Sequence, residues 1–285
     1  MLFSALLKRC YDSGVQVKEA SKIKSSFLKN DKTFLQGAEG EEFGPFDFIV
    51  AADGSRSPLR TVGDFTWTKE YAHAAVWSIS KNTSVRDELY QVVDGSDTLV
   101  GLLPTGGSEC SFFWGQRTTE WEALRALPIE QWKSSVLKVC PLAEESLSAF
   151  DSFEELTFAT YRQVWMNKWF DKKTIFIGDA AHAMSPHLGQ GVNFALIDAV
   201  TLANVLPLSS SFEDAALRYS NQRRSTVMFY WWLTRMLTPF FQSDTEILSR
   251  GRDIFLPLMT KVPWLRNQML LSMSGKKRGW FSQLL

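Results

Sequence analysis

The sequence predicts an α/β fold, α+β overall, in which a parallel sheet carries an inserted antiparallel sheet and is followed by a helical region. Three observations predict it. Two short apolar strands, at residues 46–52 and 175–177, each end beside a Gly and an Asp. Between them, residues 71–116 contain several strands separated by turn residues. After residue 200 the apolar residues recur with helical spacing.

The composition is that of an ordinary globular protein. Hydrophobic residues make up 45% of the 285 residues and charged residues 22%, which argues against a disordered or fibrous chain. Lys plus Arg equals Asp plus Glu at 31 each, so no global field attracts nucleic acid or an anionic membrane. The basic cluster Lys276–Arg278 is expected to belong to a solvated C-terminus. We therefore expect no nucleic-acid partner.

The cysteines and the first residues bear on the cellular compartment. Cys10, Cys110 and Cys140 are odd in number and follow no ligand pattern, so the sequence predicts neither a disulfide framework nor a metal site. The first residues lack the cleavage pattern of a secretory signal. They predict a helix that stops near Gly14, before a strand at 15–17. A reducing, cytoplasmic location is the expectation.

The next elements alternate between strands and helices. Short strands are expected between residues 15 and 50, and the continuous apolar run at 46–52 predicts a strand buried on both faces. Residues 71–116 predict an antiparallel meander. A helical segment at 120–138, broken at Pro128, and a strand at 155–166 then lead back to the first sheet.

The C-terminal part is predicted to be helical. Residues 211–214 form a capping box that opens a helix running to about Thr238, where Pro239 is expected to stop it. The strongly apolar stretch at 227–241 is shorter than the roughly 20 residues needed to cross a bilayer and contains Arg235. We expect no transmembrane segment and a helix that packs on its own domain, with peripheral contact to a membrane as the alternative.

The first chemical motif follows the strand at 46–52. Asp53 and Gly54 come directly after this strand, and Arg60 follows shortly afterwards. A carboxylate at the carboxyl end of a parallel strand, beside a Gly that permits close backbone approach, is the usual geometry for binding a ribose or a pyrophosphate. An Asp-Gly pair is also a common turn, so this motif alone leaves both interpretations open.

The second motif begins with another predicted buried strand, residues 175–177, which ends in Gly178 and Asp179. A loop with two further glycines leads into a helix at 192–206. The first backbone N–H groups of this helix have no obvious side-chain cap, and the helix dipole places about half a positive charge there. An anionic or electron-rich ligand group is therefore the natural partner of this loop.

Together these motifs resemble those of a known family. The pattern D-G-x-x-S-x-x-R begins at Asp53, G-D-A-A-H begins at Gly178, and G-Q-G-x-N begins at Gly189. In this order, with an antiparallel meander between them, they resemble the flavin-dependent monooxygenase superfamily typified by para-hydroxybenzoate hydroxylase and the ubiquinone-biosynthesis hydroxylases. The resemblance covers essentially the whole chain and implies a Rossmann-like FAD-binding sheet.

The resemblance also implies a cofactor and a reaction. Members bind FAD, take NAD(P)H and O2 as co-substrates, and hydroxylate an aromatic or electron-rich small molecule through a flavin C4a-hydroperoxide. The second motif would hold the ribityl or pyrophosphate region and the pyrimidine edge of the flavin, and the first would contact FAD and the NAD(P)H pyrophosphate. The implied cofactor-binding residues are Asp53, Gly54, Arg60, Gly178, Asp179, Pro186, Gly189, Gln190, Gly191, Val192 and Asn193.

No catalytic residue is assigned, because in this superfamily the chemistry belongs to the cofactor. His182 is expected to position the loop, and no other histidine is given a role in proton transfer. The meander would form the floor of the substrate pocket, with Trp77, Phe113 and Trp114 as candidate lining residues. Since side chains alternate along a strand, at most one of Phe113 and Trp114 can face the pocket.

One part of the family pattern is missing from this sequence. The G-x-G-x-x-G turn that binds the ADP half of FAD occurs nowhere in it, so we expect an N-terminally shortened form of the fold. We expect a divided FAD-binding domain at 1–66 and 155–206, a substrate domain at 67–154 and a helical region at 207–285.

Two alternatives to a hydroxylase remain open. The first is another flavin enzyme on the same fold, a prenyl-chain reductase or a halogenase. The His that follows G-D-A-A favours the hydroxylases, and the halogenase mark W-x-W-x-I-P is absent. The second is a non-catalytic remnant that acts as a binding module. The missing G-x-G-x-x-G turn favours this alternative, and the otherwise complete second motif opposes it. The sequence does not indicate an oligomeric state.

Overall fold

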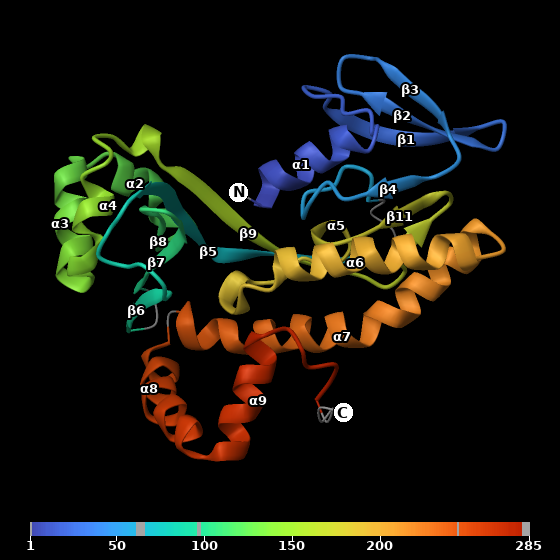
Figure 1. The fold of residues 1–285 in the computed structure, drawn as a ribbon. Coiled ribbons are helices and arrows are strands. Elements are labelled where there is room, and N and C mark those ends of the chain that lie inside the picture. Colours follow the sequence, from blue (N-terminus) through green and yellow to red (C-terminus); the bar gives the residue numbers. More distant parts are fainter. Residues whose placement is uncertain (1, 61–65, 96–97, 244, 281–285) are drawn as a thin grey trace.

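The computed structural model describes residues 2–60, 66–95, 98–243 and 245–280 (Figure 1). It contains three sheets, and long helices run beneath the second of them. The predicted class, a mixed α/β fold with an inserted antiparallel sheet and a helical C-terminal region, is confirmed. Residues 61–65, at the end of the first predicted domain segment, lie outside the described residues.

The chain begins with a helix and a small antiparallel sheet. The helix ends where Gly14 takes a left-handed φ of +76°, as the sequence predicts, but residues 15–17 form no strand. The predicted short strands then follow and pair in the order β1-β2-β3. The elements of this part are α1 (Leu2–Asp12), β1 (Ile23–Lys29), β2 (Lys32–Gly37) and β3 (Glu42–Phe46).

The second sheet carries both chemical motifs at its edge. Strand β4 (Ile49–Ala51) pairs in parallel with β11 (Thr174–Phe176), and β10 (Phe170–Asp171) pairs with β11 in the antiparallel sense. The prediction that the first of these strands is buried on both faces is wrong, because Val50 is 39% exposed. β4 is the edge strand of this sheet among the described residues, so only Ile49 and Ala51 reach the core.

The inserted sheet is the predicted antiparallel meander with one more strand. Its order is β6-β7-β8-β5-β9. Since β9 pairs with β5, the predicted boundary between residues 154 and 155 separates β9 from the sheet to which it is hydrogen-bonded. The strands are β5 (Thr66–Lys81), β6 (Tyr90–Asp94), β7 (Thr98–Gly106), β8 (Glu109–Arg117) and β9 (Thr157–Met166).

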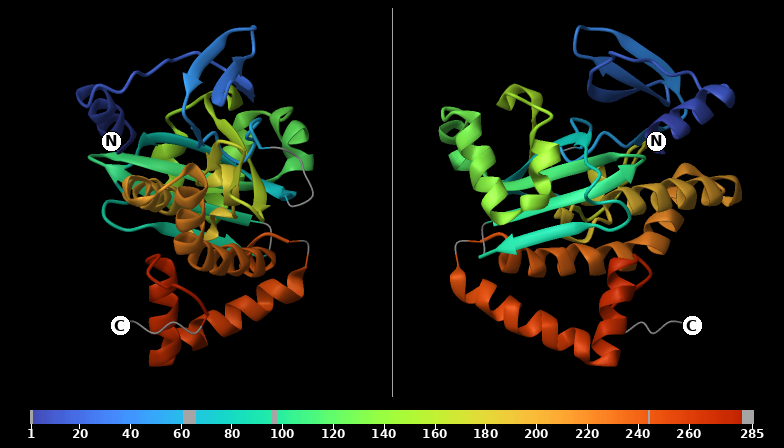
Figure 2. Two further views of the ribbon diagram at one scale, coloured as in Figure 1. Left: turned by 90° about the vertical axis from the view of Figure 1, so that its right-hand side faces the viewer. Right: turned by 60° about the vertical axis from the view of Figure 1, so that its left-hand side comes forward.

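Three helices cover one face of this inserted sheet (Figure 2). Their apolar side chains and those of the strands form a core around Trp132, which is 2% exposed. Phe112 and Trp114 of β8 both contact the Trp132 ring edge-on. The opposite face of the sheet borders a cavity. The covering helices are α2 (Trp121–Arg125), α3 (Ile129–Val139) and α4 (Glu144–Leu147).

The C-terminal half is helical, as predicted. The cap at Ser211 accepts a hydrogen bond from the Asp214 N–H at 3.2 Å. The predicted helix end at Thr238 is wrong, because α7 continues through Pro239 to Phe241. The missing N–H of Pro239 leaves one intrahelical bond unmade in the last turn, and the helix ends only two residues later. The helices are α5 (Asp179–His182), α6 (Gly191–Val205), α7 (Phe212–Phe241), α8 (Glu246–Lys261) and α9 (Pro263–Met273).

Two helical segments bear on contact with membranes. Residues 227–241 pack on their own domain as expected, since Val227, Tyr230 and Trp231 are buried. By length and composition alone, Gly191–Leu208 is a candidate to cross a bilayer, and 22% of it is buried inside the protein. This segment contains α6, whose buried Asp198 forms an ion pair with α7, so it has a structural role within the fold.

Candidate active site

The two chemical motifs lie side by side, and Arg60 joins them. Its Nη1 donates a hydrogen bond to the Ala180 carbonyl at 2.8 Å, and its Nη2 donates to the Ser55 carbonyl at 2.6 Å. The side chain is buried, and burial lowers the pKa of its guanidinium. Arg60 therefore ties the Asp-Gly turn after β4 to the loop after β11 and places a positive charge behind both.

The Asp-Gly turn after β4 has the open geometry that the sequence predicts. Gly54 has a φ of +84°, and a side chain there would meet no atom of the described residues within 4 Å. Asp53 is exposed. The Ser57 hydroxyl is buried and has no hydrogen-bond partner among the described residues. This turn therefore presents a carboxylate, an open backbone and an unpaired hydroxyl.

The N-terminus of α6 forms an open backbone cradle. Gln190 precedes the helix and gives no side-chain cap. A Cβ added at Gly191 would meet only the Asp179 Oδ1, at 3.9 Å, and one added at Gly189 would meet nothing within 4 Å. No described residue binds the exposed Asp179 carboxylate through a hydrogen bond or an ion pair. Asp179 and the free N–H groups of α6 thus face the same space.

Two of the predicted cofactor ligands use their side chains within the protein. Gln190 Nε2 donates to the Met273 carbonyl at 2.7 Å, and Asn193 Nδ2 donates to Gln190 Oε1 at 2.8 Å. These bonds fasten the end of α9 to the start of α6. What Gln190 and Asn193 offer a ligand is consequently their backbone, and Val192 between them is 64% exposed.

A buried charged cluster holds this loop, and its central residue was not predicted. Asp198 of α6 is 0% exposed. Its Oδ2 accepts a hydrogen bond from the Gly178 N–H at 2.9 Å and contacts His182 Nε2 at 2.6 Å, and its Oδ1 accepts from Arg223 Nε at 2.7 Å. Burial opposes ionisation, but these bonds hold the pKa of Asp198 below its usual range. The contacts of His182 agree with the predicted role of positioning the loop.

Gly178 is expected to tolerate no side chain. Its φ of +56° and ψ of −140° are accessible almost only to Gly, and a Cβ would lie 2.9 Å from the Ala195 Cβ. We expect Gly178→Ala to lower the free energy of unfolding by about 2–4 kcal/mol, from backbone strain and overpacking together. Urea denaturation followed by circular dichroism measures this change.

The matched control is Gly107→Ala. Gly107 also has a left-handed φ, +64°, but a Cβ there would meet no atom within 4 Å. Gly107→Ala should therefore lower the free energy of unfolding only by the cost of the left-handed backbone conformation, about 1 kcal/mol. Equal losses in the two variants would contradict a steric role for Gly178.

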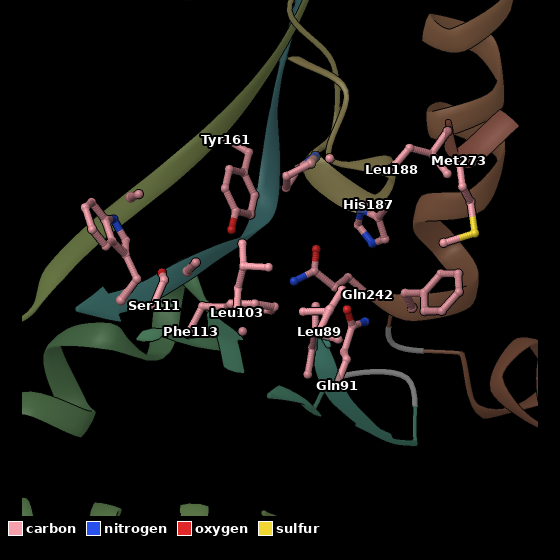
Figure 3. Close-up of a pocket in the computed structure, with 18 residues that line it drawn as sticks. Leu89, Gln91, Leu103, Ser111, Phe113, Tyr161, His187, Leu188, Gln242 and Met273 are labelled. Atoms are coloured by element: carbon pink, nitrogen blue, oxygen red, sulfur yellow. The ribbon is translucent and has the colours of Figure 1, made fainter. Parts of the chain in front are cut away.

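A cavity of about 430 Å³ lies between the inserted sheet and the loop before α6 (Figure 3). Its size is typical of small-molecule sites. Trp77 and Phe113 line it, whereas Trp114 packs into the core on the other face of the sheet, as strand alternation requires. On the loop side it is lined by Pro186, His187, Leu188 and Gly189. One short loop is thus the wall of the cavity and leads directly into the α6 cradle.

The cavity is largely apolar, and its polar groups are uncharged. Lining residues include Tyr161, His187 and Gln242, whose polar groups are shown in Figure 3; among the described residues, none that lines the cavity is Lys, Arg, Asp or Glu. Burial raises the pKa of Tyr161 to about 12 and, with a smaller contribution from His73, lowers the pKa of His187 to about 4. Both side chains are therefore neutral near pH 7.

His187 has one ring nitrogen committed and one available. Its Nδ1 lies in hydrogen-bond contact with the Ser185 hydroxyl, while its Nε2 is buried without a partner among the described residues. In the sequence, His187 lies in the loop between the predicted strand at 175–177 and the predicted helix at 192–206, but nothing in the pattern indicates that it faces the substrate side. Within the described residues no group of His, Cys, Asp and Glu side chains could hold a metal ion.

Comparison with known proteins identifies the family. The family described as FAD binding domain matches residues 4–228. The chain belongs to this family. The resemblance read from the motifs, to the FAD-dependent monooxygenases, is confirmed, and the predicted cofactor is the one that this family binds. The α6 cradle suits FAD, since it combines free backbone N–H groups, glycines and an unpaired carboxylate.

Several curated relatives are monooxygenases. The aurachin C monooxygenase/isomerase of Stigmatella aurantiaca is 27% identical over 201 residues, which are 68% of this chain and 51% of that protein. The 3-hydroxy-4-methyl-anthranilyl-[aryl-carrier protein] 5-monooxygenase of Streptosporangium sibiricum is 26% identical over 270 residues, 89% of this chain and 67% of that protein. The chain thus spans about half to two thirds of the length of these relatives.

Solved structures of flavoenzymes share the fold. Klebsiella pneumoniae HpxO, solved with FAD and uric acid, superposes with a TM-score of 0.77 at 18% identity, over 96% of this chain and 71% of that one. The tetrameric form of 2-methyl-3-hydroxypyridine-5-carboxylic acid oxygenase gives a TM-score of 0.69 at 21% identity, over 84% of this chain and 66% of that one. At these identities the likeness is one of fold.

Proposed function

We propose that this chain forms the flavin-ring and substrate-binding part of an FAD-dependent monooxygenase that hydroxylates an uncharged, largely apolar aromatic molecule. NAD(P)H and O2 are the proposed co-substrates. One observation carries the proposal: the cavity, which no charged residue of the described chain lines, shares its wall, Pro186 to Gly189, with the loop that opens the α6 cradle. A substrate in the cavity would lie next to a flavin held by that cradle.

FAD, when bound, would supply the activation of O2. The chain's own residues bind, orient and exclude water. The N–H groups at the start of α6 favour an electron-rich edge of the flavin, and the proposed ligands Asp53, Gly54 and Asp179 hold the rest of the cofactor from the two strand ends. Trp77, Phe113 and the other apolar walls keep bulk water from the reacting face.

The cavity lining favours a neutral substrate. A carboxylate or an ammonium group would lose its hydration there without gaining an opposite charge, which is costly in an apolar site. Tyr161, His187 and Gln242 offer hydrogen bonds to a carbonyl, a hydroxyl or a ring N–H instead. Relatives include proteins named 2-heptyl-3-hydroxy-4(1H)-quinolone synthase, and an alkyl-substituted quinolone is a molecule of this kind.

The test is oxygen uptake by the FAD-loaded protein with NADH or NADPH. An alkyl-4(1H)-quinolone should stimulate uptake and yield a hydroxylated product, whereas para-hydroxybenzoate, an aromatic carboxylate, should not. Stimulation by the carboxylate alone would overturn the substrate class. Product analysis separates the alternatives, since a reductase would saturate a double bond and a halogenase would add a halide. Substrate binding without any turnover would support the binding module.

The proposed location is cytoplasmic. Cys10, Cys110 and Cys140 are all free thiols, which suits a reducing compartment. A cytoplasmic location is compatible with peripheral contact between the protein and the surface of a membrane.

Tyr161→Phe should lower kcat/KM for the true substrate by about 3- to 10-fold. The hydroxyl has no protein partner among the described residues and points into the cavity (Figure 3), so its loss removes one neutral hydrogen bond, worth about 1 kcal/mol. Steady-state oxygen uptake measures the effect. Tyr90→Phe is the control, because Tyr90 does not line the cavity. An unchanged kcat/KM in Tyr161→Phe would show that the hydroxyl does not contact the substrate.

A further inference from the structure

We propose that helices α8 and α9 form a docking surface for an anionic lipid membrane, which they contact side-on. The two helices project together from the body of the protein, beneath α7 (Figures 1 and 2). Docking would place the entrance of the substrate cavity at the lipid surface. That second part of the inference depends on the proposed function, but the docking itself does not.

The first observation is a concentration of exposed apolar side chains on these helices. Ile247 is 79% exposed, Phe255 65% and Trp264 64%. Ile247, Ile254 and Leu258 are spaced seven and four residues apart, which puts them on one face of α8. Single exposed apolar residues need no explanation, but a helical face of them marks an interaction site.

The second observation is the charge on the same segment. The chain as a whole has equal numbers of acidic and basic residues, yet residues 246–280 carry seven bases and two acids. Lys261, Arg266 and Lys276 are exposed. Asp253, one of the two acids, is already paired with Arg252, at 2.6 Å. An apolar helical face flanked by cations is complementary to the surface of an anionic bilayer.

This charge pattern argues against a second copy of the chain as the occupant. A two-fold dimer would place the same patch against itself. The cations around the apolar face would then approach one another, which is unfavourable. Phosphate headgroups supply the opposite charge, and the acyl chains beneath them receive the apolar side chains. At 16 residues, α8 is too short to span a bilayer, so it would lie in the plane of the interface.

The third observation is that both ends of the helix pair border the substrate cavity. Gln242, just before α8, and Met273, the last residue of α9, line the cavity. An apolar groove of about 330 Å³ between α7 and α8 is lined by Phe240, Phe255 and Met259 among others, and it shares Phe241 with the cavity. An apolar substrate dissolved in the bilayer would reach the cavity along this groove.

The experiment is flotation of the full chain with lipid vesicles in a density gradient, without FAD or substrate. We expect the chain to float with vesicles made of equal parts of phosphatidylcholine and phosphatidylglycerol. With phosphatidylcholine alone, or in high salt, binding should fall by about 10-fold or more, since surface charge attraction is screened. No binding to either vesicle, or binding that ignores lipid charge, would overturn the proposal.

Variants of exposed residues locate the surface. Phe255→Ser combined with Trp264→Ser should weaken vesicle binding by at least about 10-fold, because two large side chains no longer enter the bilayer. Lys261→Glu combined with Arg266→Glu should abolish the preference for anionic lipid. Leu208→Ser is the control, since Leu208 is 74% exposed but lies after α6. Equal loss in this control would overturn the assignment to α8 and α9.

Two further measurements separate membrane docking from misfolding and from self-association. Circular dichroism should give the same melting temperature for all these variants, since the substituted side chains are exposed. Sedimentation velocity should show no change of oligomeric state; a dimer that the Phe255 and Trp264 variants dissociate would identify the surface as a self-association interface and overturn the proposal. A protein that binds vesicles but never hydroxylates a substrate would refute the proposed function and leave the docking surface intact.

Discussion

Asp198→Ala should lower the free energy of unfolding by about 3–5 kcal/mol, the loss typical of breaking a buried ion pair from one side. The substitution removes the carboxylate that pairs with Arg223 and His182 and that accepts the Gly178 N–H bond. Arg223 is only 6% exposed, so its charge would remain buried without its partner. Urea denaturation of the full chain, followed by circular dichroism, measures the change.

Two variants make the result specific. Asp87→Ala removes an exposed carboxylate from the loop between β5 and β6, and it should change stability by no more than about 0.5 kcal/mol. Asp198→Asn keeps one acceptor oxygen but turns its NH2 group toward a donor. Its loss of unfolding free energy should therefore be larger than that of Asp87→Ala and smaller than that of Asp198→Ala. If Asp198→Ala were as mild as Asp87→Ala, the cluster would not hold the loop together.

The same cluster predicts how stability changes with pH. The pKa of Asp198 is lower in the folded chain than in the unfolded one, because hydrogen bonds outweigh burial. Its contribution is therefore fully present above the unfolded value near 4 and is lost as the pH falls through the folded value. The stability difference between the parent chain and Asp198→Asn should consequently shrink below about pH 4.

The features that the sequence predicted well depend on local pattern. Alternation along β8 was enough to put Phe113 and Trp114 on opposite faces of the sheet, because that alternation is a property of any strand. The missing side-chain cap at the start of α6 was equally visible, since it needs only the identity of the residues before the helix. Motif order then led to the family.

The features that the sequence did not predict depend on which segments meet. Asp198 stands out as a charge within an apolar helix, which was a usable signal, but its partners His182 and Arg223 come from two other helices. The burial of β4 was overestimated, because an apolar run does not show that a strand lies at a sheet edge. The apolar surface of α8 and α9 was missed because apolar residues are denser at 227–241, where three of the six aromatic side chains are buried and two more are partly buried.

Asp179→Ala should weaken FAD binding by about 10- to 100-fold while leaving stability nearly unchanged. Hydrogen bonds from a ligand to a charged group contribute about 1.5–3 kcal/mol, and this carboxylate lies beside Gly191 with no described protein partner. For the same reason its removal leaves no protein group unsatisfied. Quenching of FAD fluorescence on titration with protein gives the dissociation constant, and urea denaturation gives the stability.

Comparing Asp179→Ala with Asp198→Ala assigns roles within the loop and the start of α6. Asp179 belongs to the loop and Asp198 to the helix that follows it. Asp179 is exposed and has no hydrogen bond or ion pair with any described residue, whereas Asp198 is buried and both of its carboxylate oxygens accept hydrogen bonds. Substitution of a residue that binds the cofactor should therefore lower the affinity for FAD without changing the free energy of unfolding. Substitution of a residue that supports the loop should lower the free energy of unfolding. Asp87→Ala again serves as the control and should alter neither quantity. Unchanged FAD affinity in Asp179→Ala would show that Asp179 does not bind the cofactor. The cradle would then consist of the backbone N–H groups at the start of α6.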